Sequence, residues 1–151
     1  MRRGPLPDGP PLLVLLLPCA LEEFELREPA QRLLAAPGAI AVEPARVSYR
    51  ALGALGPGLA YSVARRQAKR MRLPGKPRAV AVFDDLQVPL AVALAQRHAG
   101  AELWQLGSEP SDGVDSTLTL DLGATSDLRP AWERMEAIGI ESGRLGSERR
   151  L

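Results

Sequence analysis

Short apolar runs alternate along the chain with segments whose apolar residues recur at helical spacing. The alternation is clearest in residues 78–106, RAVAVFDDLQVPLAVALAQRHAGAELWQL. This segment contains an apolar strand, an acidic turn, an amphipathic helix, a glycine and a second strand. A strand–helix–strand unit of this kind is typical of a parallel α/β sheet.

The same alternation continues on both sides of this unit. It predicts strands at residues 12–17, 39–42, 79–83, 102–106 and 117–122. Helices are predicted at about 29–36, in two pieces between 45 and 73 (the second about 59–72), after Asp85, and at about 128–138. The expected fold is therefore α/β: a doubly wound, mostly parallel, Rossmann-like sheet of about five strands.

One domain accounts for the whole chain. Its 151 residues suit a single folded unit, and 46% hydrophobic with 25% charged residues is the globular average. Because four prolines occur in the first eleven residues, we expect a flexible tail at 1–11 and a Rossmann-like domain at 12–139. A frayed tail is expected at 140–151.

Composition narrows the classes of function. A net charge of +1 provides no global field, and aromatic residues make up only 4%, so we expect no nucleic-acid partner. Seventeen of the 19 basic residues are arginine in a chain rich in Ala, Gly and Pro, so single arginines carry little functional weight.

The N-terminus and the cysteine content favour the cytoplasm. Arg2, Arg3, the apolar run 12–17 and Cys19 faintly resemble a bacterial lipoprotein signal. However, the run has only six residues, and Pro18 occupies a position where a small residue is needed. Because Cys19 is the only cysteine, neither an internal disulfide nor a cysteine-based zinc cluster can form.

Candidate binding residues follow the predicted strands, since ligands of open parallel sheets lie beyond the carboxyl ends of the strands. The candidates for substrate binding are Glu22, Asp84, Asp85, Gln105 and Ser108. Asp84 and Asp85 could hold Mg²⁺ or a sugar hydroxyl. The simpler interpretation is that both stabilise the start of the next helix, with Asp85 as its cap.

No motif identifies a reaction, and the catalytic residues stay unknown. GxGxxG after the first strand, GxxxxGK[ST], GxSxG and HExxH are all absent. Cys19 is followed by the acidic, glycine-free ALEEFELR, which would repel an anion and raise the thiol pKa, so we interpret it as structural. His98 is the only histidine, which excludes a multi-histidine metal site, and its position in a last helical turn suits the helix dipole. No resident cofactor or metal is indicated.

A basic run lies in the helix predicted at 59–72. Arg65, Arg66, Lys69 and Arg70 form two i,i+4 pairs, so one helix face concentrates positive charge. This face could contact acidic lipid headgroups or a phosphate-bearing partner, making the protein membrane-peripheral. The alternative is a solvated outer face.

Three segments carry a family resemblance: LLPCALEEFELREPAQRL, RVSYRALGAL and VARRQAKRMRLPGKPRAVAVFDDLQVPLAVALAQRHAGAELW. Together, over residues 13–106, they resemble the N-terminal Rossmann-like half of GT-B glycosyltransferases, in particular family-4-like enzymes. The matching segments belong to the scaffold rather than to a catalytic signature.

The resemblance implies sugar transfer from a nucleotide-activated donor, with a nucleotide sugar as substrate and this half binding the acceptor. In such enzymes a second domain binds the donor, and nothing beyond Leu106 resembles one. The resemblance therefore implies a truncated acceptor-side domain, or one that needs a donor-binding partner chain. The alternative is a non-catalytic Rossmann-like module that binds a partner or a small ligand.

Overall fold

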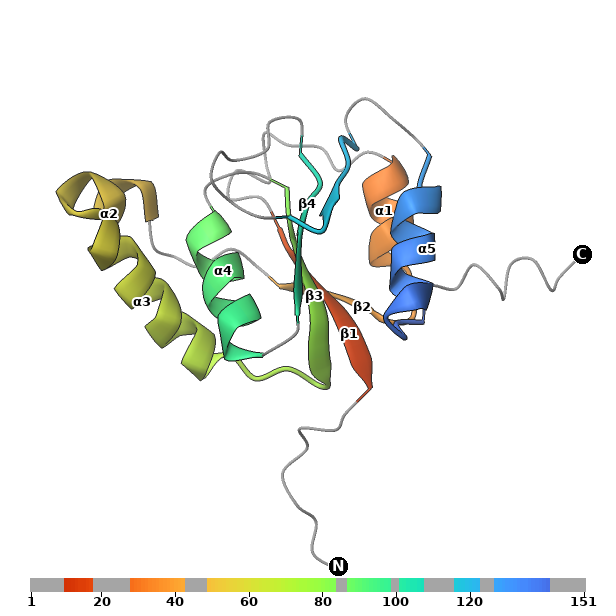
Figure 1. Ribbon diagram of the computed structural model, residues 1–151, viewed down its shortest axis with the longest axis horizontal. Helices are drawn as coiled ribbons and strands as arrows, with labels where there is room; N and C mark the ends of the chain where they lie inside the picture. Colours follow the sequence, from red (N-terminus) through yellow and green to blue (C-terminus); the bar gives the residue numbers. More distant parts are fainter. Residues whose placement is uncertain are drawn as a thin grey trace, which may run out of the picture.

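The computed structural model describes residues 10–17, 28–42, 49–83, 87–98, 101–107, 116–122 and 127–141. Within them, five strands form one sheet in the order β2-β1-β3-β4-β5, and each neighbouring pair is parallel (Figure 1). The strands are β1 (Pro11–Leu16), β2 (Ala39–Val42), β3 (Lys76–Val82), β4 (Glu102–Gln105) and β5 (Leu118–Thr119). The helices are α1 (Glu28–Leu34), α2 (Tyr49–Leu55), α3 (Pro57–Arg70), α4 (Val88–Arg97) and α5 (Arg129–Ala137). The expected α/β, Rossmann-like class is confirmed, as is the order of the elements.

β1 lies at the centre of the fold and is buried on both faces. Its side chains alternate between two apolar clusters: Leu13 and Leu15 point to one, Val14 and Leu16 to the other. All four are at most 1% exposed. An uninterrupted apolar run is the pattern that a parallel strand needs between two helical layers.

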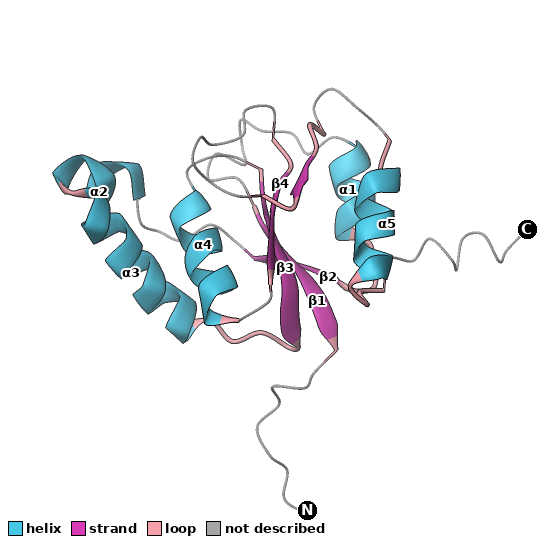
Figure 2. Ribbon diagram, in the orientation of Figure 1, coloured by secondary structure: helices cyan, strands magenta, loops and turns pink. Residues whose placement is uncertain are grey.

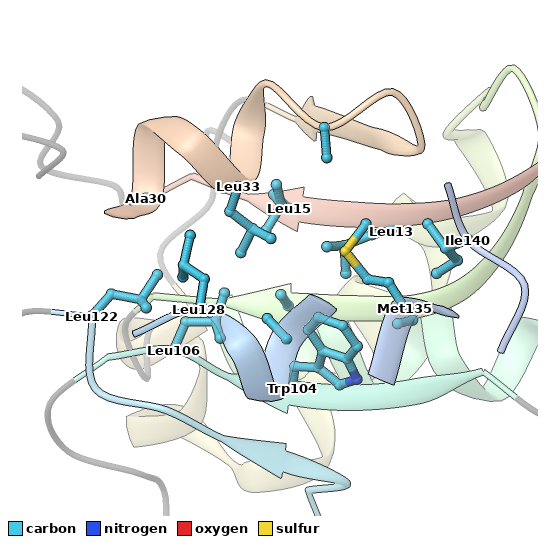
Figure 3. Close-up of a cluster of buried hydrophobic side chains, with 14 of the residues drawn as sticks. Leu13, Leu15, Ala30, Leu33, Trp104, Leu106, Leu122, Leu128, Met135 and Ile140 are labelled. Carbon is cyan, nitrogen blue, oxygen red and sulfur yellow. The ribbon is translucent and has the colours of Figure 1, made fainter. Parts of the chain in front are cut away.

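The first cluster lies under α1 and α5 (Figure 2). Trp104 of β4 is fully buried there, and Figure 3 shows its ring beside Met135 of α5. Leu33 of α1 closes the cluster from the other helix. One large aromatic side chain therefore occupies much of the space between the sheet and α5.

The second cluster lies under α4 and α3 on the opposite face. α4 packs directly on the sheet, and α3 contributes a stripe of Ala60, Ala64 and Ala68, each at most 4% exposed. Small residues four apart allow two helices to approach closely, so α3 forms an outer layer against α4 with α2 at its end (Figure 1). Among the residues described, no helix combines the length and the apolar composition that crossing a bilayer requires.

Several predicted boundaries are shifted. The first strand begins at Pro11, and the fifth has two residues, 118 and 119, rather than the six expected at 117–122. α4 begins at Val88 with Gln87 as its N-cap, so the predicted cap at Asp85 is two residues too early. The side chain of Gln87 makes no hydrogen bond that caps the helix.

α4 and α5 each carry proline in their first turn, where its missing N–H costs little. Just before α5, Oδ1 of Asp127 accepts the backbone N–H of Arg129 at 3.0 Å. Gly139 follows this helix with φ of 82°, a conformation that glycine adopts without steric strain.

The packed chain continues past Gly139, beyond the domain boundary expected at 139. Ile140 is 2% exposed and belongs to the cluster that contains Trp104. The carbonyl of Glu141 accepts a hydrogen bond from the backbone N–H of Gly38 at 2.8 Å. These two residues therefore attach the chain after α5 to the turn between α1 and β2.

We predict that Ile140→Ala lowers the free energy of unfolding by about 2–4 kcal/mol, because it removes a fully packed side chain. Glu141→Ala is the matched control: its side chain is exposed and its hydrogen bond is made by the backbone, so a change within about 0.5 kcal/mol is expected. Urea denaturation of the two variants measures the difference. Equal stability of both would show that the chain after Gly139 is not part of the cooperative unit.

Candidate functional site

The strand order defines one topological switch point. From β1 the chain crosses to β2 on one side, and from β3 it crosses to β4 on the other, while β1 and β3 are themselves neighbours. In doubly wound sheets of order 2-1-3-4-5, the crevice outside the carboxyl ends of these two strands is where ligands bind. This crevice is the candidate site.

The described borders of the crevice are apolar. Leu16 and Val82 are paired at the ends of the two strands, and both are buried. Phe83 follows β3 and is 5% exposed, and Gln87 lies buried at the start of α4. The described residues here are thus buried, and Gln87 is the polar one among them.

Most of the polar residues predicted for this site lie outside the described residues. They are Glu22, Asp84, Asp85 and Ser108. In sequence they follow β1, β3 and β4, the strands that border or adjoin the switch point. Their role in binding stays a prediction.

Gln105 is described, and it makes an internal contact. Its side chain is 4% exposed, and Nε2 donates a hydrogen bond to Oγ of Ser116 at 2.5 Å. This bond ties the end of β4 to the segment that leads into β5, which is a structural role. Next to it, Gly107 packs so tightly on β3 that a Cβ there would lie 2.1 Å from the carbonyl oxygen of Phe83, so only glycine fits.

Among the described residues, the most extensive polar network lies at the amino ends of the strands, opposite to the crevice. Glu102, the first residue of β4, accepts hydrogen bonds from the buried indole N–H of Trp104 at 3.0 Å and from Nε of Arg134 at 2.8 Å. Nη2 of Arg134 also donates to this carboxylate. Burial of Glu102 opposes its ionisation, but hydrogen bonds from Arg134 and Trp104 outweigh it and lower its pKa. The network joins β4 to α5 and satisfies the indole, which is a structural function.

This network was not anticipated from the sequence. Glu102 and Arg134 are 32 residues apart, one on a strand and the other on a helix. The sequence does not show which residues of these two elements lie opposite each other. Only the position of Glu102 two residues before Trp104 on the same face of a strand could have indicated part of it.

His98 also lies at this amino edge, at the C-cap of α4. Its pKa is lowered, first by burial and then by the positive charges of Arg97 and Lys76. Helix-dipole stabilisation of a charged imidazole, the interpretation drawn from the sequence, is therefore outweighed. His98 is instead a marker of the positive potential around it.

The basic residues of α3 lie on its surface. Arg65, Arg66, Lys69 and Arg70 are all exposed, and the only hydrogen bond recorded for any of their side chains joins Nη2 of Arg65 to Oγ of Ser62 at 3.3 Å. Within the described part of the chain, none of the four forms an ion pair. All four charges are therefore exposed to solvent.

The described residues include no group of three or more His, Cys, Asp or Glu side chains that could hold a metal ion. Comparison of the chain with models of protein families, with curated protein sequences and with solved structures finds no match. The function of the chain is therefore inferred from its own sequence, geometry and charges.

We predict that Glu102→Gln lowers the melting temperature at neutral pH. The folded-state pKa of Glu102 lies below its unfolded value, so the ionised carboxylate contributes stability that is lost as the pH falls through the folded-state pKa. The difference between the variant and the parent should therefore shrink in acid. Thermal unfolding followed from neutral pH into acid measures it, with the exposed Glu133→Gln on α5 as control. A difference that stays constant with pH would contradict the assigned role of the charge.

Proposed function

We propose that this chain is a Rossmann-like binding domain whose ligand lies in the crevice at the carboxyl ends of β1 and β3. The single observation that carries the proposal is the strand order β2-β1-β3-β4-β5, which has its switch point between these two strands. The sequence supplies acidic side chains directly after both strands, Glu22 after β1 and Asp84 and Asp85 after β3. Carboxylates in such positions can accept hydrogen bonds from sugar hydroxyls.

We further propose that the ligand belongs to a sugar transfer, either as the acceptor or as a nucleotide-activated donor. The resemblance of residues 13–106 to the acceptor-side half of GT-B glycosyltransferases supports this chemistry. Where the ligand is the acceptor, a partner chain binds the donor. The presence of one cysteine, with no internal disulfide to form, supports a cytoplasmic setting.

A second candidate is a non-catalytic module that binds a partner or a small ligand. One observation favours it: Gln105, the candidate binding residue that the structure describes, is buried and hydrogen-bonded to Ser116 within the chain.

A thermal-shift screen against nucleotide sugars, free nucleotides and simple glycosides tests the proposal. A ligand present at about 100 times its dissociation constant adds about 2.7 kcal/mol to the stability of the native state, enough to raise the melting temperature by a few degrees. We expect a nucleotide sugar or a glycoside to produce such a shift, and the double variant Asp84→Asn/Asp85→Asn to lose it.

The matched control is Glu133→Gln/Glu136→Gln, which removes the same charge from α5, away from the crevice. This variant should keep the shift. No shift with any sugar compound would reject the sugar-transfer chemistry, and a shift that survives Asp84→Asn/Asp85→Asn would reject the assigned acidic residues.

A further inference from the structure

The charges of this chain are segregated along the sequence and between the two faces of the sheet. Residues 44–101 contain ten Lys and Arg residues and two acidic residues, whereas residues 102–151 contain five and ten. Within the described stretches 49–83 and 87–98, which form α2, α3, β3 and α4, there is no Asp or Glu. The helical layer on this face therefore has positive charges without any carboxylate of its own.

The outer surface of α3 concentrates this charge. Its inward stripe is Ala60, Ala64 and Ala68, packed against the core. At about 100° per residue, Arg66 and Arg70 lie on the side opposite to this stripe. In the figures α3 and α2 form the outermost helical layer of this face, away from the sheet (Figures 1 and 2).

Two leucines are exposed where α2 meets α3. Leu55, the last residue of α2, is 80% exposed, and Leu59 in the first turn of α3 is 42% exposed. Among the described residues, Leu55 and Leu59 are the large hydrophobic side chains that are exposed. Leu59 precedes Arg66 by seven residues, which is close to two helical turns, so both lie on the same stripe of α3. The surface thus combines cations with protruding apolar groups.

Helix-dipole stabilisation accounts for only part of the basic surface. Lys69 and Arg70 lie in the last turn of α3, where positive charge is favourable. Arg65 and Arg66 lie in the middle of the helix and gain nothing from the dipole. Arg97 and Lys76 add positive charge near the adjoining end of α4, where burial and then these two charges lower the pKa of His98.

We infer that the outer surface of α2 and α3 docks on an anionic lipid bilayer, with the arginines at the headgroups and Leu55 and Leu59 inserted between them. The cations match the charge of acidic headgroups, and the leucines require an apolar phase that a bilayer provides. Nucleic-acid phosphates would engage the cations but would leave the leucines in water. The docked surface is separate from the crevice, so this inference does not depend on the proposed ligand.

Vesicle co-sedimentation of the full chain tests this inference. The protein should sediment with vesicles of phosphatidylcholine and phosphatidylserine at low salt, be released at high salt, and not bind phosphatidylcholine alone. Arg66→Gln/Arg70→Gln should weaken partitioning about 25-fold, since each basic residue near an anionic surface contributes about fivefold. Leu55→Ser/Leu59→Ser should also weaken it, while leaving the salt dependence in place.

Arg32→Gln/Arg129→Gln is the matched control, because it changes the net charge equally on the face of α1 and α5. All substituted positions are on the surface, and circular dichroism checks that each variant folds. Failure to bind anionic vesicles at low salt would overturn the inference, as would equal weakening by the control variant. Binding to duplex DNA or RNA as tight as to vesicles, and insensitive to Leu55→Ser/Leu59→Ser, would assign the surface to nucleic acid instead.

Discussion

The burial of β1 between two helical layers is the constraint on which the rest of the structure depends. Each of its four central residues, from Leu13 to Leu16, is in van der Waals contact with one layer or the other, and none can be polar. A parallel sheet requires crossover connections, and these place α1 on one face and α2, α3 and α4 on the other. The position of β1 between β2 and β3 also creates the switch point, because the chain leaves β1 and β3 in opposite directions. The position of β1 therefore accounts for both the apolar core and the location of the candidate site.

The order of the elements could be predicted from the sequence because apolar periodicity records which faces are buried. The run at 12–17 and the strand–helix–strand unit at 78–106 were each correctly assigned, and the prolines of α4 and α5 marked the helix starts. The predicted ends of elements were wrong where contacts between distant parts of the chain determine them. Ile140 looks like part of a polar tail, yet it is buried against the first cluster because the chain turns back at Gly139. β5 itself contains only residues 118 and 119, although the backbone N–H groups of Thr117, Leu120 and Leu122 also donate to carbonyls of residues 103–106.

The candidate site could be predicted only as a location. The rule for open sheets indicates the carboxyl edge, but which side chains converge there depends on loop conformations that periodicity does not encode. Gln105 illustrates the difficulty: it follows the pattern of a site residue, but its amide is engaged with Ser116. The contact of Glu102 with Arg134 was equally inaccessible, because it requires the register of α5 against β4. By contrast, the exposure of the basic residues of α3 agrees with the prediction from their i,i+4 spacing, which gathers them on one helix face.

The crevice and the outer surface of α2 and α3 could both be occupied at the same time, because they lie on different sides of the molecule. The crevice lies at the carboxyl ends of the strands, whereas the outer surface of α3 is a side of the molecule (Figure 1). A bilayer against α2 and α3 would lie beside the crevice and would not cover it. The acidic residues of α5, Glu133 and Glu136, would then face away from the headgroups, since α5 is on the opposite side of the sheet. Charge segregation of this kind orients a protein as well as attracting it, because only one face gains energy from the negative surface potential. A site beside the membrane would meet ligands that are carried by lipid or released close to it.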